Sequence, residues 1–314
     1  MSAHATPRQA PLHAPADAAE LAALVRDASA RRARLRIRGA GTWMDAGHPV
    51  RDAELLSLEA FRGIDAYTPG DLTISVGAST TLAELDEATR AHRQWCPLLP
   101  WGDDSGTVGA TVATATAGPS AAVLRRPRDL VLGVEAVDGR ARTLVAGGRV
   151  VKNVAGFDLT RALTGSWGTL AVITRLHLRL RALPPGEESW VLHSDDAGVQ
   201  RLRSALDAFA RGPLAPLAMV RLGAANATAL GFDASARALV RVGGNAAFVA
   251  ESRARLAACG DARPVDPAIW TAVRSRLAPE DRARRWDWNA LALRIRERFD
   301  PQRLLNPGLL GDAA

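Results

Sequence analysis

The feature that most constrains this chain is a long segment without bulky side chains. From Gly106 to Gly118 no side chain is larger than valine. A membrane-spanning or helix-packing segment would carry larger and more apolar residues, whereas small residues and hydroxyls let the backbone pass close to a bound molecule. We interpret residues 106–118 as a tightly threaded loop beside a cofactor, in preference to a packing helix.

Two other segments place glycines where strands are expected to end. The first is Arg38–Trp43, which follows the alternating residues 34–38, and the second comprises residues 147–159 and 165–174. Backbone N–H groups in such turns can bind an anion, and the pyrophosphate of FAD is an anion of this kind. On its own, the segment Arg38–Trp43 is equally consistent with an ordinary strand–turn junction.

The spacing of the glycines disfavours other nucleotide-binding motifs. The segment Arg38–Trp43 lacks the third glycine of the G-x-G-x-x-G fingerprint, which argues against a Rossmann fold. Lys152 follows no G-x-x-x-x-G run, which excludes a Walker-type phosphate loop. Lys152 is nevertheless the only lysine among 40 basic residues, so either chance retention or a need for a compact ammonium group explains it.

The hydrophobic pattern predicts an α+β fold. Asp17 is placed to cap a helix over residues 17–25, and Thr81 opens a capping box ahead of a second helix. Pro184–Gly186 interrupts the pattern and is the expected domain boundary. Alternating runs predict strands at 34–38, 72–76, 130–137, 141–145, 170–180 and 238–242, and helical spacing predicts helices at 199–210, 246–258 and 288–299.

Composition narrows the classes of function. A net charge of +7 invites a nucleic-acid-binding interpretation, but the arginines are interleaved with Asp and Glu, so this stays a remote alternative. Cys96 and Cys259 are the only cysteines, which excludes a disulfide framework or an iron–sulfur cluster built by this chain alone. The six histidines show no metal-ligand spacing, so no metal site is expected.

The hydropathy pattern also bears on location. No apolar run is long enough to span a membrane, and residues 1–20 lack the apolar centre of a secretory signal. We expect a cytoplasmic protein without direct membrane insertion, which partner proteins could hold at the periphery of the inner membrane. A positive surface would suit an acidic partner or an anionic substrate.

Taken in order, the glycine-rich segments resemble those of the vanillyl-alcohol-oxidase-type flavoproteins, whose FAD domain is called the p-cresol-methylhydroxylase type. That family carries R-G-G-G-T, then P-x-x-P with T-I-G-G and small residues, then G-S-x-G-T-L-G-V-I-T. The matching segments here are 38–42, 97–118 and 165–174, within a resemblance that covers roughly residues 17–183. Phe299–Pro301 and Leu305–Gly308 resemble the end of the family's oxidases, and residues 148–159 look most like the FAD-binding subunits of bacterial glycolate oxidases.

The resemblance implies a domain organisation and a cofactor site. It implies an FAD-binding domain over residues 1–184, a small α+β cap domain over 185–285, and a C-terminal helix and tail over 286–314 that pack back on the FAD domain. Thr42 stands where some relatives carry a flavin-linking His, so non-covalent FAD is expected. The residues expected at the cofactor are Arg38, Gly39, Ala40, Gly41, Thr42, Trp43, Pro100, Gly102, Asp104, Ser105, Gly106, Thr107, Gly109, Ala110, Thr111, Gly118, Lys152, Gly168, Val172 and Ile173.

The chain also departs from the family pattern. Ala40 and Ala110 replace family glycines, and a methyl group is tolerated there only where φ is negative. Ala115 stands where Asn is common, and Trp167 where an acidic residue is common. Trp43, Trp101 and Trp167 all fall in the expected flavin loops, where packing is a simpler role for them than stacking on the flavin.

Oxidation of a 2-hydroxy acid needs a cation for the carboxylate and a base for the hydroxyl proton. Residues 186–285 contain one histidine, His193, and His177 lies on an alternating strand that favours a solvent-facing position over a basic role. These residues make turnover by the chain alone unexpected. The resemblance to glycolate oxidase subunits implies the FAD-binding subunit of a glycolate oxidase-like complex, with a second flavoprotein subunit and an iron–sulfur subunit as partners and a small 2-hydroxy acid as substrate. A self-sufficient FAD-linked 2-hydroxy-acid dehydrogenase is the alternative, and the catalytic residues stay unassigned.

Overall fold

The N-terminal part of the chain folds into a small parallel sheet covered by one helix. The computed structural model describes residues 11–148, 158–278 and 288–311. Helix α1 (Ala18–Arg31) is capped by Asp17, whose carboxylate accepts hydrogen bonds from the backbone N–H groups of Ala19 and Glu20, as the sequence predicts. Its apolar face packs on the sheet, whose order is β1 (Leu12–His13), β3 (Ala53–Ser57) and β2 (Arg34–Arg38).

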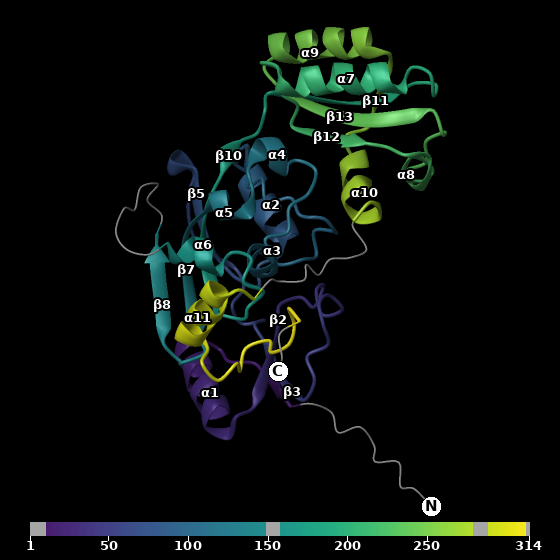
Figure 1. Ribbon diagram of the computed structural model, residues 1–314. Helices are drawn as coiled ribbons and strands as arrows, with labels where there is room; N and C mark the ends of the chain where they lie inside the picture. The colour runs from purple at the N-terminus through teal and green to yellow at the C-terminus, as the bar shows by residue number, and fades with distance from the viewer. Residues whose placement is uncertain (1–10, 149–157, 279–287, 312–314) are drawn as a thin grey trace, which may run out of the picture.

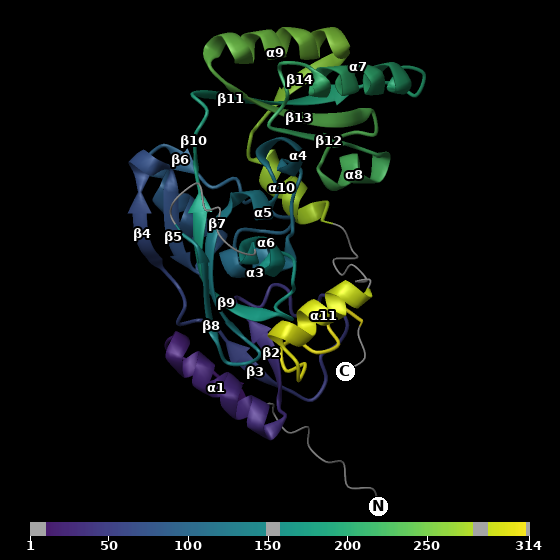
Figure 2. The same cartoon turned by 60° about the vertical axis from the view of Figure 1, so that its left-hand side comes forward.

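The second layer is a five-stranded sheet in which every neighbouring pair is antiparallel. Its order is β4 (Ile64–Thr68), β5 (Thr73–Gly77), β9 (Ala171–Arg179), β7 (Val131–Asp138) and β8 (Thr143–Gly147). Because successive side chains point to opposite faces, Ile74, Val76 and Leu176 face one side, where helices bury them. These helices are α2 (Leu82–Arg90), α3 (Val108–Thr114), α5 (Pro127–Leu130) and α6 (Leu159–Leu163), and they lie on one face of the sheet, where Figure 2 labels α3, α5 and α6.

The run of small residues forms a helix, so its interpretation as a threaded loop is wrong. Residues 108–114 are the helix α3, capped by Thr107. A Cβ atom added to Gly109 would lie 2.7 Å from the Cβ of Ala78, so the helix sits unusually close to the end of β5. Small side chains are needed here because they permit this close packing.

The third layer is a four-stranded antiparallel sheet with helices on both faces. Its order is β12 (Ala218–Arg221), β13 (Ala236–Gly244), β11 (Gly186–His193) and β14 (Asp261–Val265). Helices α7 (Val199–Arg211) and α9 (Ala246–Cys259) cover one face, and α8 (Ala224–Ala229) and α10 (Ile269–Arg276) cover the other (Figure 1). The remaining short elements are η1 (Pro69–Asp71), β6 (Gln94–Trp95), α4 (Ala121–Leu124) and β10 (Arg181–Ala182), and β10 pairs with β6.

The end of the chain returns to the first sheet. After α11 (Ala290–Phe299), residues 304–306 run parallel to β2. The backbone N–H of Leu35 donates to the Leu304 carbonyl at 2.8 Å, and the N–H of Asn306 donates to the Leu35 carbonyl at 2.9 Å. The turn before this segment is held by Asp300, whose carboxylate accepts from the N–H groups of Leu304 and Leu305. The tail therefore acts as an extra strand on the edge of the sheet.

Two further observations on the described residues concern membrane-spanning helices and metal sites. Within the described ranges, no helix has the length and apolar character that a membrane crossing requires. Over the same residues, no cluster of three or more His, Cys, Asp or Glu side chains is placed to hold a metal ion.

Candidate functional site

The glycine-rich segments that are distant in sequence meet in one cleft of about 710 Å³. Its walls are the end of β2 with the loop after it, the first turn of α3, and the turn before β9. The tail supplies a fourth side through Asn306 and Leu309. The cleft is lined by Arg36, Ile37, Arg38, Gly39, Ala40, Gly41, Thr42, Trp43, Met44, Leu58, Ala78, Ser79, Thr107, Gly109, Ala110, Ala113, Thr114, Trp167, Gly168, Ala171, Val172, Ile173, Asn306 and Leu309.

The first wall exposes backbone donors. A Cβ atom on Gly39 would lie 2.8 Å from the Oγ1 atom of Thr107, so only glycine lets this turn approach α3 so closely. Within the described residues, the backbone N–H groups of Gly39, Ala40 and Gly41 donate no hydrogen bond. Three consecutive donors on the wall of a cleft form a ready site for an anion.

The same loop is shaped by an arginine from β2. The Nη2 atom of Arg36 donates to the carbonyl oxygens of Trp43 and Met44, each at 3.3 Å. Arg36 lies on the same face of β2 as Arg38, because residues two apart in a strand point to the same side. Burial lowers the pKa of the Arg36 guanidinium below its ordinary value, so this cation lies in a partly dehydrated place.

The third wall is a turn whose backbone adopts the left-handed conformation. Trp167 has φ 56° and Gly168 has φ 69°. The ring of Trp167 meets that of Trp43 edge to face, with centroids 5.6 Å apart and planes at 89°. The two indoles therefore pack on each other and fix the separation of the first and third walls. Neither Ala40 nor Ala110 has a positive φ, which is why a methyl group is tolerated at both positions.

The electrostatics of the cleft suit an anionic dinucleotide. Among the described residues, the lining includes two arginines and no carboxylate. The hydroxyl oxygen of Ser79 is buried in this wall without a hydrogen-bond partner among them. A phosphate bridge needs donors and positive charge, and apolar walls suit flat rings. The residues present therefore fit a flavin dinucleotide.

The structure brings together most of the sequence-predicted cofactor residues. Arg38, Gly39, Ala40, Gly41, Thr42, Trp43, Thr107, Gly109, Ala110, Gly168, Val172 and Ile173 line the cleft. Lys152 and most of the segment 148–159 lie outside the described residues. Seven others do not line the cleft: Pro100, Gly102, Asp104, Ser105, Gly106, Thr111 and Gly118.

These seven residues have other structural roles. The Pro100 carbonyl and the Asp104 carboxylate accept from Arg274, and the N–H of Gly102 donates to the Arg274 carbonyl. The Ser105 N–H donates to Asp103, and the Gly106 carbonyl accepts from the Leu82 N–H. The Thr111 hydroxyl donates to the Thr107 carbonyl inside α3, and Gly118 packs against the Leu99 carbonyl. They support the loop and the helix behind the cleft wall.

Sequence reasoning did not assign several lining residues to the site. The alternation of β2 carried the signal for Arg36, since it shares a face with Arg38. Trp167 was placed in a flavin loop without a role at the cofactor. Asn306 falls in the segment Leu305–Gly308 that resembles the family's oxidases, but it was given no role at the cofactor, because only the return of the tail brings it to the cleft. The other unassigned residues are Ile37, Met44, Leu58, Ala78, Ser79, Ala113, Thr114, Ala171 and Leu309.

A second cleft lies between the five-stranded and four-stranded sheets. Its cations are all paired with carboxylates, as Arg241 is with Glu187 at 2.7 Å and Arg274 is with Asp104 at 2.7 Å. The third arginine of this lining, Arg90, pairs with Asp86. The part of the chain that the structure describes thus offers no unpaired cation here to a substrate carboxylate.

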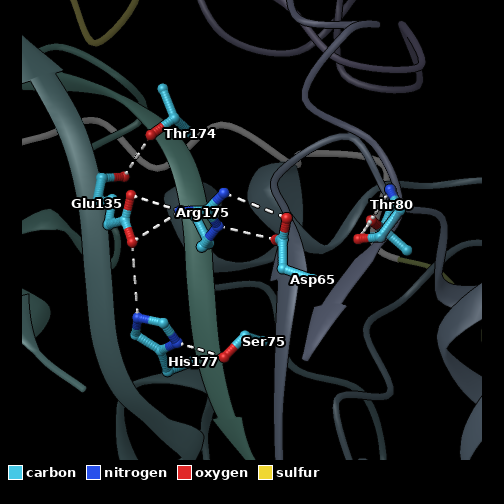
Figure 3. A network of polar contacts seen from close by, with 8 residues as sticks. Asp65, Ser75, Thr80, Glu135, Thr174, Arg175 and His177 are labelled. Carbon is cyan, nitrogen blue, oxygen red and sulfur yellow. Dashed lines mark hydrogen bonds and ion pairs between the residues drawn. The ribbon is translucent and has the colours of Figure 1, made fainter. Parts of the chain in front are cut away.

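His177 and His193 make polar contacts outside the two clefts. The Nδ1 atom of His177 lies 2.6 Å from the Ser75 hydroxyl and its Nε2 atom lies 3.9 Å from Glu135, on the face of the five-stranded sheet opposite to the helices (Figure 3). Glu135 is also bound by Arg175 of the neighbouring strand. The Nδ1 atom of His193 lies 2.9 Å from the Ser235 hydroxyl. Of the histidines in the described ranges, none lines either cleft.

The described residues form a two-sheet core, a cleft suited to an anionic dinucleotide and a third sheet, as in flavin-binding proteins. Comparison with known proteins agrees, since residues 10–147 match the FAD binding domain family. The solved structure of p-cresol methylhydroxylase with substrate bound shares the fold, with a TM-score of 0.65 and 12% identity over 86% of this chain and 62% of that one. The chain therefore has the fold of a p-cresol-methylhydroxylase-type FAD domain, and the match of residues 10–147 to the FAD binding domain family supports FAD as its cofactor.

Two curated relatives narrow the comparison. Glycolate oxidase subunit GlcE of Escherichia coli strain K12 is 36% identical over 155 residues, which are 47% of this chain and 42% of that one. A D-lactate dehydrogenase of Archaeoglobus fulgidus is 34% identical over 167 residues, which are 53% of this chain and 37% of that one. The chain thus spans less than half the length of these relatives.

Proposed function

We propose that the cleft between the segment Arg36–Met44, the first turn of α3 and the turn before β9 holds FAD non-covalently. The open N–H groups of Gly39, Ala40 and Gly41 would bind the pyrophosphate, with Arg36 and Arg38 supplying positive charge. Thr42 offers no nucleophilic nitrogen for a covalent link to the flavin. When bound, FAD supplies acceptor chemistry for two electrons, while the protein positions it and excludes water.

We further infer that the chain is the FAD-binding subunit of a glycolate oxidase-like complex, in which oxidation of a 2-hydroxy acid delivers electrons to a partner iron–sulfur subunit. The observation that carries this proposal is an asymmetry between the two clefts. The cofactor cleft contains arginines without carboxylates, whereas the second cleft contains only arginines that are already paired, and neither has a described histidine. A carboxylate substrate needs a cation and a base. Apart from the two arginines assigned to the cofactor, the described residues of the two clefts offer it neither an unpaired cation nor a histidine. The similarity to a glycolate oxidase subunit supports the same assignment.

The proposal is tested by adding substrate to the purified chain. The chain should be yellow, and anaerobic glycolate or D-lactate should leave its visible absorbance unchanged. Absorbance should fall when the second flavoprotein subunit and the iron–sulfur subunit are added together. A colourless chain that takes up no FAD would contradict the whole assignment.

A self-sufficient FAD-linked 2-hydroxy-acid dehydrogenase is the second candidate, favoured by the similarity to a D-lactate dehydrogenase. Rapid bleaching of the isolated chain by D-lactate would establish it and overturn the subunit proposal. Salt-sensitive retention on nucleic acid by a flavin-free chain would support the remote basic-protein alternative. The pairing of arginines such as Arg62, Arg175 and Arg253 with carboxylates speaks against that alternative, because paired cations contribute less to phosphate binding.

A further inference from the structure

One side chain of the tail joins two walls of the cofactor cleft. The Oδ1 atom of Asn306 accepts from the backbone N–H of Ile37 at 2.9 Å, and its Nδ2 atom donates to the carbonyl of Trp167 at 2.8 Å. Asn306 is 4% exposed. Both ends of one buried amide are therefore used, each on a different wall.

The backbone of Asn306 is suited to this position. Its φ is 44°, in the left-handed region where Asn, Asp and Gly are the residues most easily accepted. Its N–H donates to the Leu35 carbonyl at 2.9 Å, so the main chain pairs with β2. Asn306 therefore binds β2 through both its side chain and its main chain.

The contacts of Asn306 adjoin the parts of the wall that face the ligand. Ile37 immediately precedes the loop Arg38–Gly41, and Trp167 immediately precedes Gly168. A Cβ atom on Gly168 would lie 2.8 Å from the Asn306 Nδ2 atom, so the turn and the amide are packed against each other. A change in the amide would therefore alter the separation of the first and third walls.

We propose that Asn306 is a positioning residue of the FAD site, so that docking of the tail and binding of FAD are linked. It holds the backbone donors of the first wall and the turn of the third wall at the spacing that the dinucleotide requires. By linkage, whatever weakens the docking of the tail weakens FAD binding, and FAD in turn stabilises the docked tail. This inference rests on the FAD site alone and does not depend on the substrate or on partner subunits.

The variant Asn306→Asp tests the proposal with little change in shape. Aspartate accepts the same φ, and its carboxylate can still accept from the Ile37 N–H, but it has no donor for the Trp167 carbonyl. A protonated carboxyl group regains a donor, and burial raises the pKa of a carboxyl group. We expect the FAD dissociation constant of N306D to be on the order of tenfold larger than wild type at pH 8 and to return toward wild type near pH 5.5.

The pH dependence of the FAD dissociation constant of N306D is compared with that of the wild type. Asp300 in the same tail has a pKa raised by burial, and this carboxyl group is present in both proteins. His48, which lies beside Gly311, and the cleft residues Arg36 and Arg38 are also common to both proteins. Dissociation constants from flavin fluorescence at pH 8 and pH 5.5 for wild type and N306D separate the contribution of residue 306 from these groups. Asn226→Asp, on the exposed helix α8, makes the same chemical change away from the cleft and should bind FAD as wild type does.

A second readout follows the tail itself. Trypsin cleavage after Arg303, followed by mass spectrometry of the released peptide, should be slowed by FAD in wild type but not in N306D at pH 8.

N306D that binds FAD as wild type does at both pH values would overturn the proposal. So would a loss of affinity that is the same at both pH values, because this would indicate only general damage to the fold. If N306D does not fold by circular dichroism, Asn306→Gly replaces it, and unchanged FAD affinity in that variant would be the overturning result. A wild-type chain without FAD affinity would instead refute the cofactor assignment.

Discussion

Arg274 of α10, a helix that packs on the four-stranded sheet, forms an ion pair with Asp104 in the loop that precedes α3. The Nη2 atom of Arg274, on α10, lies 2.7 Å from the Asp104 carboxylate, and its Nε atom donates to the Pro100 carbonyl at 2.8 Å. The side chain of Arg274 is only 9% exposed. The loop 100–104 behind the cofactor cleft is therefore anchored to α10, which packs on the four-stranded sheet.

Replacing Arg274 with Met should destabilise this junction. The substitution leaves the Pro100 carbonyl without its donor and Asp104 without its partner, although Asp104 stays partly solvated. We expect a loss of about 1–3 kcal/mol in the free energy of unfolding, measured by urea denaturation. Arg255→Met, which breaks the exposed pair with Glu251, is the control and should change it by less than about 1 kcal/mol. Equal effects of the two variants would contradict the role of the buried pair.

Replacing Arg36 with Met should weaken FAD binding and reduce its dependence on salt. The substitution removes a positive charge from the cleft and the donors that hold the Trp43 and Met44 carbonyls. We expect a dissociation constant on the order of tenfold larger, measured by fluorescence titration at low and high salt. Arg34→Met on the same strand lies outside the cleft and should leave both quantities unchanged.

Replacing Gly109 with Ala should destabilise the chain by overpacking. The added Cβ atom would lie 2.7 Å from both the Cβ and the carbonyl oxygen of Ala78, and a backbone atom cannot move aside easily. We expect a cost of about 1–3 kcal/mol in urea denaturation. A Cβ atom on Gly223 would meet nothing within 4 Å, so Gly223→Ala should have a much smaller effect.

Replacing alanine with glycine at two exposed positions should change the free energy of unfolding in opposite directions. Ala115 ends α3 with φ 51°, a left-handed conformation that strains an alanine, so Ala115→Gly should stabilise the chain by about 1 kcal/mol. Ala257 lies inside α9, where Ala257→Gly should cost about 1 kcal/mol. Thermal unfolding of the two variants measures the signs, and destabilisation by both would show that Ala115 is not strained.

Replacing Glu54 with Gln should remove part of the acid sensitivity of the chain. Hydrogen bonds from Arg31 and His13 lower the pKa of Glu54 from 4.5 to about 2. A carboxyl group with a lowered pKa contributes stability that is complete above its unfolded pKa and is lost as the pH falls through the folded pKa. The free energy of unfolding of E54Q should therefore fall less than that of wild type between pH 5 and pH 3. Glu59→Gln, an exposed surface change, should follow the wild-type curve.

The parts of the fold with strong local patterns were predictable. Strand β2 alternates and ends at a glycine, and α1 and α2 begin at capping residues, so their positions follow from short-range rules. Strands β3 and β4 lack regular alternation, since Glu54 and Asp65 hold surface ion pairs, and the sequence did not predict them. Their positions depend on pairing with strands elsewhere in the chain.

The site was predictable where it is built from contiguous motifs. The loop Arg38–Trp43 and the turn at Gly168 were found because glycines mark them. The segment 106–118 was misread because small side chains serve a close helix–strand contact as well as they serve a loop, and local composition does not separate the two. Asn306 is separated from Ile37 by 269 positions, so only the folded tail shows that the two are bonded.

The parallel course of Leu304–Asn306 beside β2 has a consequence for the order of events during synthesis. The edge of the first sheet at β2 stays uncovered until residues 304–306 have left the ribosome. The cofactor cleft lacks its fourth side before then, so flavin uptake is expected to follow the synthesis of these residues. Nascent chains stalled before residue 304 should be recovered from ribosomes without flavin, whereas released full-length chains should carry it.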